Sequence, residues 1–313
     1  MTLSLDPIRS DMIAWAESLW LEDAGAFRNG DSSEPSLQSS LFIAYILYSV
    51  DALDAVTCDR AKWIAWIQTQ QSEDGSFAFS PAIGSSRPRR GIALWNAVRA
   101  LNILDDQILR FPAYQREATT VDGLREWFKT WEACRDSHHE VLALVPTLVS
   151  HPNTEWVETF FDQLAEQQHP TMGTWPKGDG PANISRTFAY SLIHMGMGRV
   201  PPQASRIVDA TLSLQGEDGF WLGRPAFATM DAVYLLSRFA KAIEWREADT
   251  RSALHRVADA VIPYYETHAE RDKADTHQFT ALVQTLALLS EALPERFTTS
   301  RPWRFGWDNK AFW

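Results

Sequence analysis

Gln71-Ser-Glu-Asp-Gly75-Ser-Phe77, Gln168-His-Pro-Thr-Met-Gly173-Thr-Trp175 and Gln215-Gly-Glu-Asp-Gly219-Phe-Trp221 are three copies of one phrase, each following a stretch with helical periodicity. A weaker copy, Leu21-Glu-Asp-Ala-Gly25-Ala-Phe27, keeps the acid, the glycine and the aromatic residue but lacks the glutamine. A unit repeated at a fixed period buries its apolar face against its neighbours. The repetition by itself therefore predicts a fold built from repeated units, without reference to any single residue.

The spacing of the glycines in these phrases gives the length of the repeated unit. Gly25, Gly75, Gly173 and Gly219 are separated by 50, 98 and 46 residues, and the middle step is about two units long. We therefore expect a degenerate copy near Gly123. A unit of this length fits two helices of about 11 or 12 residues with short loops, and six such helical hairpins fill the 313 residues.

Apolar residues recur with a helical period, and strand-like alternation is absent from the sequence. The segments richer in apolar residues are 36–53, 90–104, 137–149, 183–195, 227–239 and 276–293. The more charged segments are 12–21, 60–71, 121–134, 154–167, 203–214 and 250–267. Helices of an inner ring are covered on more sides than helices of an outer ring, so this alternation predicts an all-α fold, a closed (α/α)6 barrel or toroid. We expect one domain at residues 1–313 with a Trp-rich tail at 301–313.

Proline and glycine residues cluster between the repeated phrases and the apolar segments that follow them, as at 176–181 and 223–225. Each phrase is therefore expected to link an outer helix to the next inner helix. In a closed ring these links emerge at one end, where the inner helices present free N–H groups and the positive ends of their dipoles. We expect the functional site at this mouth.

The composition argues against several classes of function. A net charge of −11 without a dense basic run disfavours nucleic-acid binding. The two cysteines form neither a disulfide framework nor a Cys-x-x-Cys pair, which favours a reducing, cytoplasmic location. The amino terminus does not read as a signal peptide, and no apolar run approaches the roughly 20 residues of a membrane span. We therefore expect a soluble protein without an integral membrane segment.

The phrase Gln-x-x-x-Gly-x-aromatic resembles the QW motif of the terpenoid cyclase and protein prenyltransferase superfamily. The copies at Gln71 and Gln215 match its full spacing, and the copy at Gln168 has one extra residue. The resemblance implies the same (α/α)6 toroid and a structural role for the motif residues. A chain of this length resembles a lone terpene cyclase toroid domain, or a prenyltransferase β-subunit without its partner.

The acidic signatures of that superfamily are incomplete here. Class II terpene cyclases carry Asp-x-Asp-Asp at the start of an inner helix, and the nearest phrases are Asp275-Thr276-His277-Gln278 and Ala228-Thr229-Met230-Asp231. The inner-helix segments lack the Asp-Asp-x-x-Asp motif of a Mg²⁺-diphosphate site, and neither cysteine has the Asp-x-Cys context of the prenyltransferase zinc site. We predict no cofactor, and a metal at a collar of His and Asp side chains stays open.

Candidate site residues are polar groups near the starts of the inner helices and aromatic residues along them. The candidate catalytic acids and bases are Asp231, Asp275, His277, His138, His139 and Glu140. Arginines that fit a diphosphate or a carboxylate are Arg89, Arg90 and Arg186. Aromatic residues whose π faces can stabilise a carbocation are Trp95, Phe188, Tyr190, Phe227, Tyr234 and Phe279. Asp231 and the pair Asp275/His277 are the preferred acids.

Three functions fit these residues. The first is a terpene-cyclase-like enzyme, an isomerase or lyase that applies acid–base chemistry to an isoprenoid or other long apolar substrate, with arginines orienting an anionic end. The second is a carbohydrate-active (α/α)6 lyase or hydrolase, in which carboxylates flank a glycosidic bond. The third is a non-catalytic binding module or partner subunit that uses the acidic surface and the Trp-rich tail as an interface.

Overall fold

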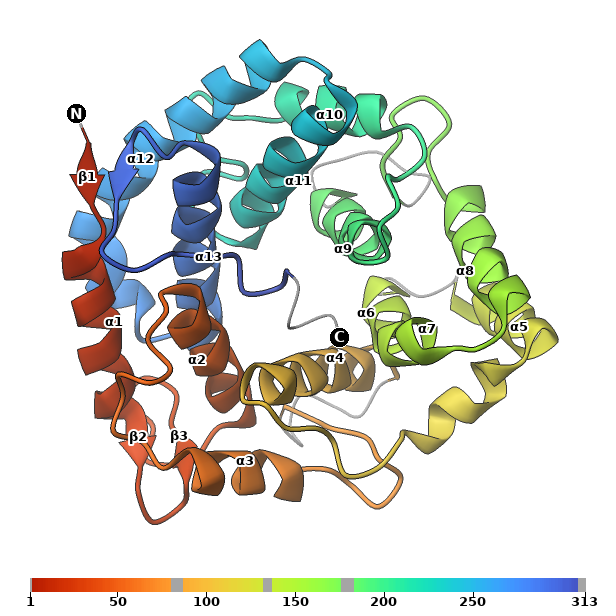
Figure 1. Cartoon of the computed structure of the whole chain (residues 1–313), viewed down its shortest axis with the longest axis horizontal. Helices are drawn as coiled ribbons and strands as arrows, with labels where there is room; N and C mark the ends of the chain where they lie inside the picture. The colour runs from red at the N-terminus through yellow and green to blue at the C-terminus, as the bar shows by residue number, and fades with distance from the viewer. Residues whose placement is uncertain (1, 80–86, 132–136, 176–182, 309–313) are drawn as a thin grey trace.

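The chain folds into two concentric rings of helices in the computed structural model, which describes residues 2–79, 87–131, 137–175 and 183–308 (Figure 1). The inner helices are α2 (Leu37–Ser49), α4 (Arg87–Ile103), α6 (Ser137–Ala143), α9 (Asn183–Gly196), α11 (Phe227–Ile243) and α13 (Thr276–Ala292). The outer helices are α1 (Asp6–Leu19), α3 (Arg60–Thr69), α5 (Val121–Trp131), α8 (Thr154–Glu166), α10 (Ala204–Ser213) and α12 (Glu247–Asp272). Each inner helix contacts the next and α13 contacts α2, so the inner ring is closed. The predicted all-α toroid is confirmed.

Burial distinguishes the two rings as the apolar pattern predicts. In α13 every residue from Phe279 to Leu289 is buried, because α11, α2 and α12 surround it. The outer helix α3 buries Trp63 and Ile67 and leaves its other side chains wholly or partly exposed. Removal of this apolar surface from water is the main favourable contribution to folding.

The full copies of the repeated phrase make equivalent contacts between repeats. The side-chain amide of Gln71 donates to the carbonyl oxygens of Gly75 (2.9 Å) and Arg110 (2.7 Å), and Gln168 and Gln215 make the corresponding pairs of bonds. Gly75 has φ +82°, and a Cβ there would lie 2.8 Å from a backbone oxygen of the following loop. Glycine and glutamine therefore tie each loop to the start of the next repeat.

In three copies of the phrase, the aromatic residue is bound to the inner helix that follows it. The backbone N–H of Trp175 donates to the hydroxyl of Thr187 (3.0 Å), and that of Trp221 donates to Thr229 (3.0 Å). In the weaker copy the hydroxyl of Ser40 has the same role. These hydroxyl groups near the amino ends of inner helices are therefore used to fix the loops.

Two local predictions differ from the structure. The segment at 137–149 is not one inner helix but two, α6 and α7 (Val145–Ser150), because Pro146 has no N–H to continue the helical hydrogen bonding. Gly123 lies in the first turn of α5 rather than in a loop, where a Cβ would lie 1.9 Å from a backbone oxygen. The segment that follows α5, where the repeat places a loop, lies outside the described residues.

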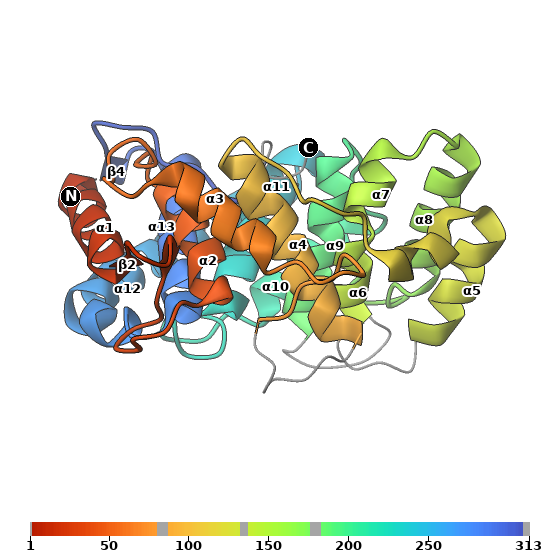
Figure 2. The same ribbon diagram turned by 90° about the horizontal axis from the view of Figure 1, so that it is seen from below.

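The two ends of the described chain close the outer ring. Strand β1 (Leu3–Ser4) pairs in parallel with β4 (Phe297–Thr298), and β4 lies toward one flat face of the ring (Figure 2). The ammonium group of Lys273, just after α12, contacts the carboxylate of Asp11 on α1 at 2.7 Å. The remaining short elements are β2 (Trp20–Leu21), β3 (Ala26–Phe27) and the 3-10 helix η2 (Ala113–Thr119).

Candidate functional site

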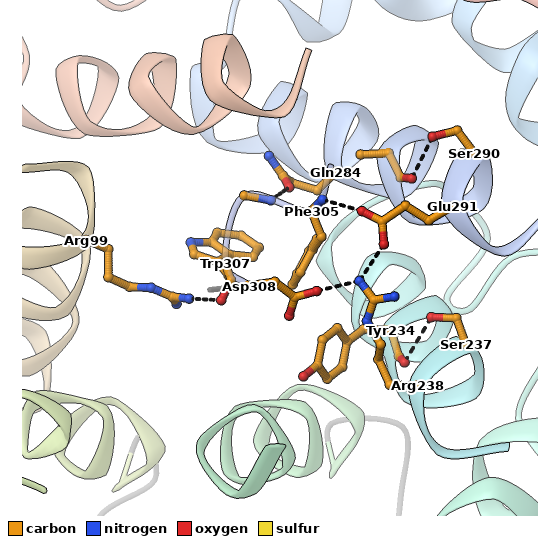
Figure 3. A network of polar contacts seen from close by, with 12 residues as sticks. Arg99, Tyr234, Ser237, Arg238, Gln284, Ser290, Glu291, Phe305, Trp307 and Asp308 are labelled. Atoms are coloured by element: carbon orange, nitrogen blue, oxygen red, sulfur yellow. Dashed lines mark hydrogen bonds and ion pairs between the residues drawn. The ribbon is translucent and has the colours of Figure 1, made fainter. Parts of the chain in front are cut away.

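The carboxyl-terminal segment of the chain lies inside the inner ring (Figures 1 and 3). After β4 it passes the carboxyl end of α2, where the N–H of Arg304 donates to the carbonyl of Ser49 (2.9 Å), and it then enters the lumen. Trp303, Phe305 and Trp307 are each 5% exposed or less. This differs from the tail that the sequence suggested as an interface, because these three aromatic side chains pack within the ring.

One face of α11 lines the lumen. Phe227, Asp231 and Tyr234 follow at helical intervals and therefore share a face. The ring of Phe227 lies 6.1 Å from that of Trp307, and the ring of Tyr234 lies 5.2 Å from that of Phe305. Asp231 thus lies on the lumen side of α11, between two aromatic residues that contact the carboxyl-terminal segment.

The carboxyl group of Asp231 is buried, with 2% of the residue exposed. Its Oδ1 atom has no hydrogen-bond partner among the described residues. Burial raises the pKa of Asp231 to about 8. A hydrogen bond from Ser185 on α9 opposes this increase, but its effect on the pKa is smaller than that of burial. The group is therefore largely protonated at neutral pH and can donate a proton.

Asp275 and His277 lie together at the start of α13 but differ in their surroundings. The carboxylate of Asp275 accepts the backbone N–H groups of His277 (3.0 Å) and Gln278 (3.4 Å), which makes it the amino-terminal cap of the helix. The imidazole of His277 lies 5.2 Å from the ring of Phe42 and 4.3 Å from that of Phe227. Burial lowers the pKa of His277, although Asp275 opposes this. Asp275 therefore stabilises the helix, and His277 places an uncharged imidazole among the aromatic rings.

The other predicted polar residues lie near the amino ends of α4, α6 and α9. Glu140 is buried and His139 is half-buried in the first turn of α6. Arg186 is half-buried on α9, next to the Ser185 that reaches Asp231. Three predicted residues have side chains outside the described residues and stay predictions: Arg89, Arg90 and His138.

Several of the predicted aromatic residues converge in the lumen. The ring of Phe188 lies 5.0 Å from that of Tyr234 and 6.2 Å from that of Trp307. Trp95 is stacked beneath the guanidinium group of Arg99 at 4.0 Å. Together with Phe227, these residues form an aromatic wall drawn from three inner helices and the carboxyl-terminal segment.

Tyr190 and Phe279 point away from this wall, which corrects their prediction as lumen-lining residues. The ring of Tyr190 packs 5.7 Å from Trp175, in the loop after α8. The ring of Phe279 packs 4.9 Å from Trp15, on the outer helix α1. Both are inner-helix residues whose side chains fill the space between the two rings. Helical periodicity alone does not distinguish this side of a fully buried helix from the lumen side.

Polar side chains that hold the carboxyl-terminal segment were missed by sequence reasoning. Arg99 of α4 is 1% exposed and donates to the carbonyl of Trp307. Gln284 of α13 is fully buried and accepts the N–H of Gly306 (2.7 Å). Both lie in the middle of the apolar stretches predicted as inner helices. A long polar side chain within an apolar stretch could have indicated these residues, because a buried polar group requires a hydrogen-bond partner.

A polar cavity of about 340 Å³ lies at the opposite end of the ring, near the carboxyl ends of α2 and α4. The charged groups around it largely serve the fold. The guanidinium of Arg304 contacts the carboxylate of Asp51 at 2.6 Å, and Arg9 donates to the backbone carbonyl of Asp51 (2.8 Å). We assign no ligand to this cavity.

The described part of the chain lacks both a metal cluster and a membrane-spanning helix. Among these residues no three His, Cys, Asp or Glu side chains converge so as to hold a metal ion. Cys58 is half-buried, and Cys134 lies outside the described residues. The prediction of no cofactor therefore stays a prediction. No helix among them is long and apolar enough to cross a membrane.

Comparison with known families supports the superfamily that the repeated phrase suggested. The family model of the prenyltransferase alpha-alpha toroid domain matches residues 4–130. This part contains the first two copies of the phrase, at Gly25 and Gly75. The resemblance to the terpenoid cyclase and prenyltransferase superfamily is therefore confirmed over this part of the chain. No curated protein matches the sequence. The fold is thus established, and the function has to be inferred from the residues of the lumen.

Proposed function

We propose that the protein is a terpene-cyclase-like enzyme that applies acid–base chemistry to an isoprenoid or another apolar substrate at the amino end of the lumen. The observation that carries this proposal is the carboxyl group of Asp231. It is buried on the lumen face of α11, its Oδ1 atom has no partner among the described residues, and its pKa is raised to about 8. A buried acid with a raised pKa beside aromatic side chains is the expected signature of a general acid.

The raised pKa favours one kind of proton transfer. A general acid is most effective when its pKa lies near the working pH, whereas protonation of an unactivated alkene requires a much stronger acid. We therefore propose a proton shift or an elimination, an isomerase or lyase reaction, with Asp231 as the proton donor and the uncharged His277 as the acceptor. The rings of Phe188, Phe227 and Tyr234 stabilise the positive charge that develops on the substrate. Arg186, with Arg90, orients an anionic end.

Turnover assays with a matched pair of variants test this assignment. The protein is incubated with farnesol, geranylgeraniol and their diphosphates, and products are identified by mass spectrometry. Asp231→Asn keeps the shape of the side chain but removes the proton, so turnover should fall by about a hundredfold or more. Asp162→Asn changes an exposed carboxylate on the outer helix α8 and should leave turnover unchanged. Full turnover by Asp231→Asn would show that another group donates the proton.

A non-catalytic binding module is the second candidate, because the carboxyl-terminal segment fills part of the lumen with buried aromatic side chains. Ligand-induced shifts in Tm separate the candidates. Stabilisation by farnesol or geranylgeraniol supports the apolar-substrate enzyme, and stabilisation by oligosaccharides supports the carbohydrate-active alternative. If neither class raises the Tm, the binding module is favoured.

A further inference from the structure

The carboxyl-terminal segment is bound through its backbone by side chains of the inner ring. The N–H of Phe305 donates to the carboxylate of Glu291 (2.8 Å), and the N–H of Gly306 donates to the amide oxygen of Gln284 (2.7 Å). On α4, the buried guanidinium of Arg99 donates to the carbonyl of the next residue, Trp307 (Figure 3). Three successive residues are thus held by side chains from α13 and α4. Such backbone contacts are typical of the recognition of an extended peptide.

The same contacts select particular side chains in the segment. A Cβ at Gly306 would lie 2.9 Å from the hydroxyl oxygen of Ser49 and 3.0 Å from the amide nitrogen of Gln284, so a larger residue here would force these side chains to shift. Ser49 and Gln284 are themselves joined by a hydrogen bond of 2.7 Å, so neither is free to move aside. At Asp308, the carboxylate pairs with Arg238 of α11. Arg238 is held in place by Glu291 at 2.6 Å.

The aromatic residues on either side of the glycine occupy separate parts of the wall. Phe305 packs against Tyr234, with ring centroids 5.2 Å apart. Trp307 packs against Tyr45 of α2 at 5.5 Å and lies 6.1 Å from Phe227 at the start of α11. The lumen therefore distinguishes the order aromatic, glycine, aromatic, acid along the segment.

We propose that the lumen is a sequence-selective binding site for an extended aromatic peptide, and that the chain's own residues 303–308 occupy it. This goes beyond the proposed enzymatic function, since it requires no substrate or reaction. The site is built from groups of four inner helices, α2, α4, α11 and α13. Ser49, Arg99 and Gln284 are buried, and Arg99, Gln284 and Glu291 are directed at the peptide backbone. Trp307 also lies 6.1 Å from Phe227, so the bound segment borders the region proposed for the substrate.

Peptide binding in trans tests the proposal. A chain that ends at Ser300 is titrated with a synthetic peptide of residues 301–313 and followed by isothermal titration calorimetry. We expect saturable one-to-one binding, weakened at least tenfold by Gly306→Ala or by Asp308→Asn in the peptide. Pro302→Ala changes an exposed position and serves as the matched control, with affinity close to that of the native peptide. Equal affinities for all four peptides, or no binding by a folded truncated chain, would overturn the proposal.

A second form of the experiment covers the case in which the truncated chain does not fold. A protease cleavage site is inserted between the exposed Ser300 and Arg301 of the full chain, which is cut after folding. The cut segment should stay with the ring on size-exclusion chromatography and should exchange with labelled native peptide but not with the Gly306→Ala peptide. Immediate release of the segment, or exchange with both peptides alike, would overturn the proposal.

Discussion

Replacement of Asp231 by asparagine should remove a pH dependence from the stability of the protein. Burial raises the pKa of this carboxyl group from 3.8 to about 8. Between these values the folded chain binds a proton that the unfolded chain has released, so the free energy of unfolding falls by up to about 1.4 kcal/mol per pH unit as the pH rises. The contribution is fully present below the unfolded pKa and is lost as the pH rises through the folded pKa. From about pH 5 to about pH 7, the wild type should lose about 2 to 3 kcal/mol relative to Asp231→Asn.

Urea unfolding followed by circular dichroism at both pH values measures this difference. The asparagine side chain has a destabilising effect of its own, which does not depend on pH and cancels when the two pH values are compared. Asp162→Asn, on the exposed side of α8, is the matched control and should follow the wild type. Parallel pH profiles for the wild type and Asp231→Asn would refute a protonated buried carboxyl group. They would also remove the basis for proposing Asp231 as the proton donor.

Three further measurements test other parts of the structure. Gly75→Ala should lower the free energy of unfolding in urea by about 2 to 4 kcal/mol. Gly198→Ala has a similar φ but no heavy atom within 4 Å of the new Cβ, so it should lower this free energy by about 1 kcal/mol. Equal losses would show that backbone strain alone, and not the close contact at Gly75, causes the effect. Gln71→Met should lower the free energy of unfolding by about 2 to 4 kcal/mol, because backbone groups of two loops lose their hydrogen-bond partner. Gln70→Met serves as the control, and equal losses for the two variants would contradict the role of Gln71 in joining the repeats. In an NMR titration the imidazole of His277 should titrate below the ordinary value of 6.5, and titration at or above this value would contradict its burial among aromatic rings.

The fold could be predicted from the sequence because its determinants are local and repeated. A glycine at positive φ and a glutamine four or five residues before it impose a similar loop geometry wherever they recur, and the apolar pattern indicates which helices are covered on more sides. The predicted repeat was wrong where a single residue altered the local structure. Pro146 divides one inner helix, and Gly123 is required by a close approach to a neighbouring backbone oxygen rather than by a loop.

The site was predicted less completely, because its residues meet only through the closure of the ring. Asp231 was identified from its place at the start of an inner helix, and its raised pKa results from packing that the sequence does not encode locally. Asp275 also lies near the start of an inner helix, but its carboxylate accepts two backbone N–H groups of that helix. The contact between Arg99 and Trp307 spans 208 positions of sequence, which no local pattern predicts.

The two halves of the lumen differ in polarity, and this bears on where an apolar substrate can bind. In the half toward the carboxyl ends of the inner helices, Gln284, Glu291 and Arg99 direct polar atoms at the backbone of residues 305–307. An isoprenoid that displaced the segment would remove these hydrogen bonds and offer none in return, and buried polar groups that lose their partners cost about 1 to 3 kcal/mol each. Around Asp231 the wall is aromatic instead, with Phe227 and His277 in contact. If the proposed reaction occurs, its substrate therefore binds in the half toward the amino ends, with Trp307 between it and the polar half.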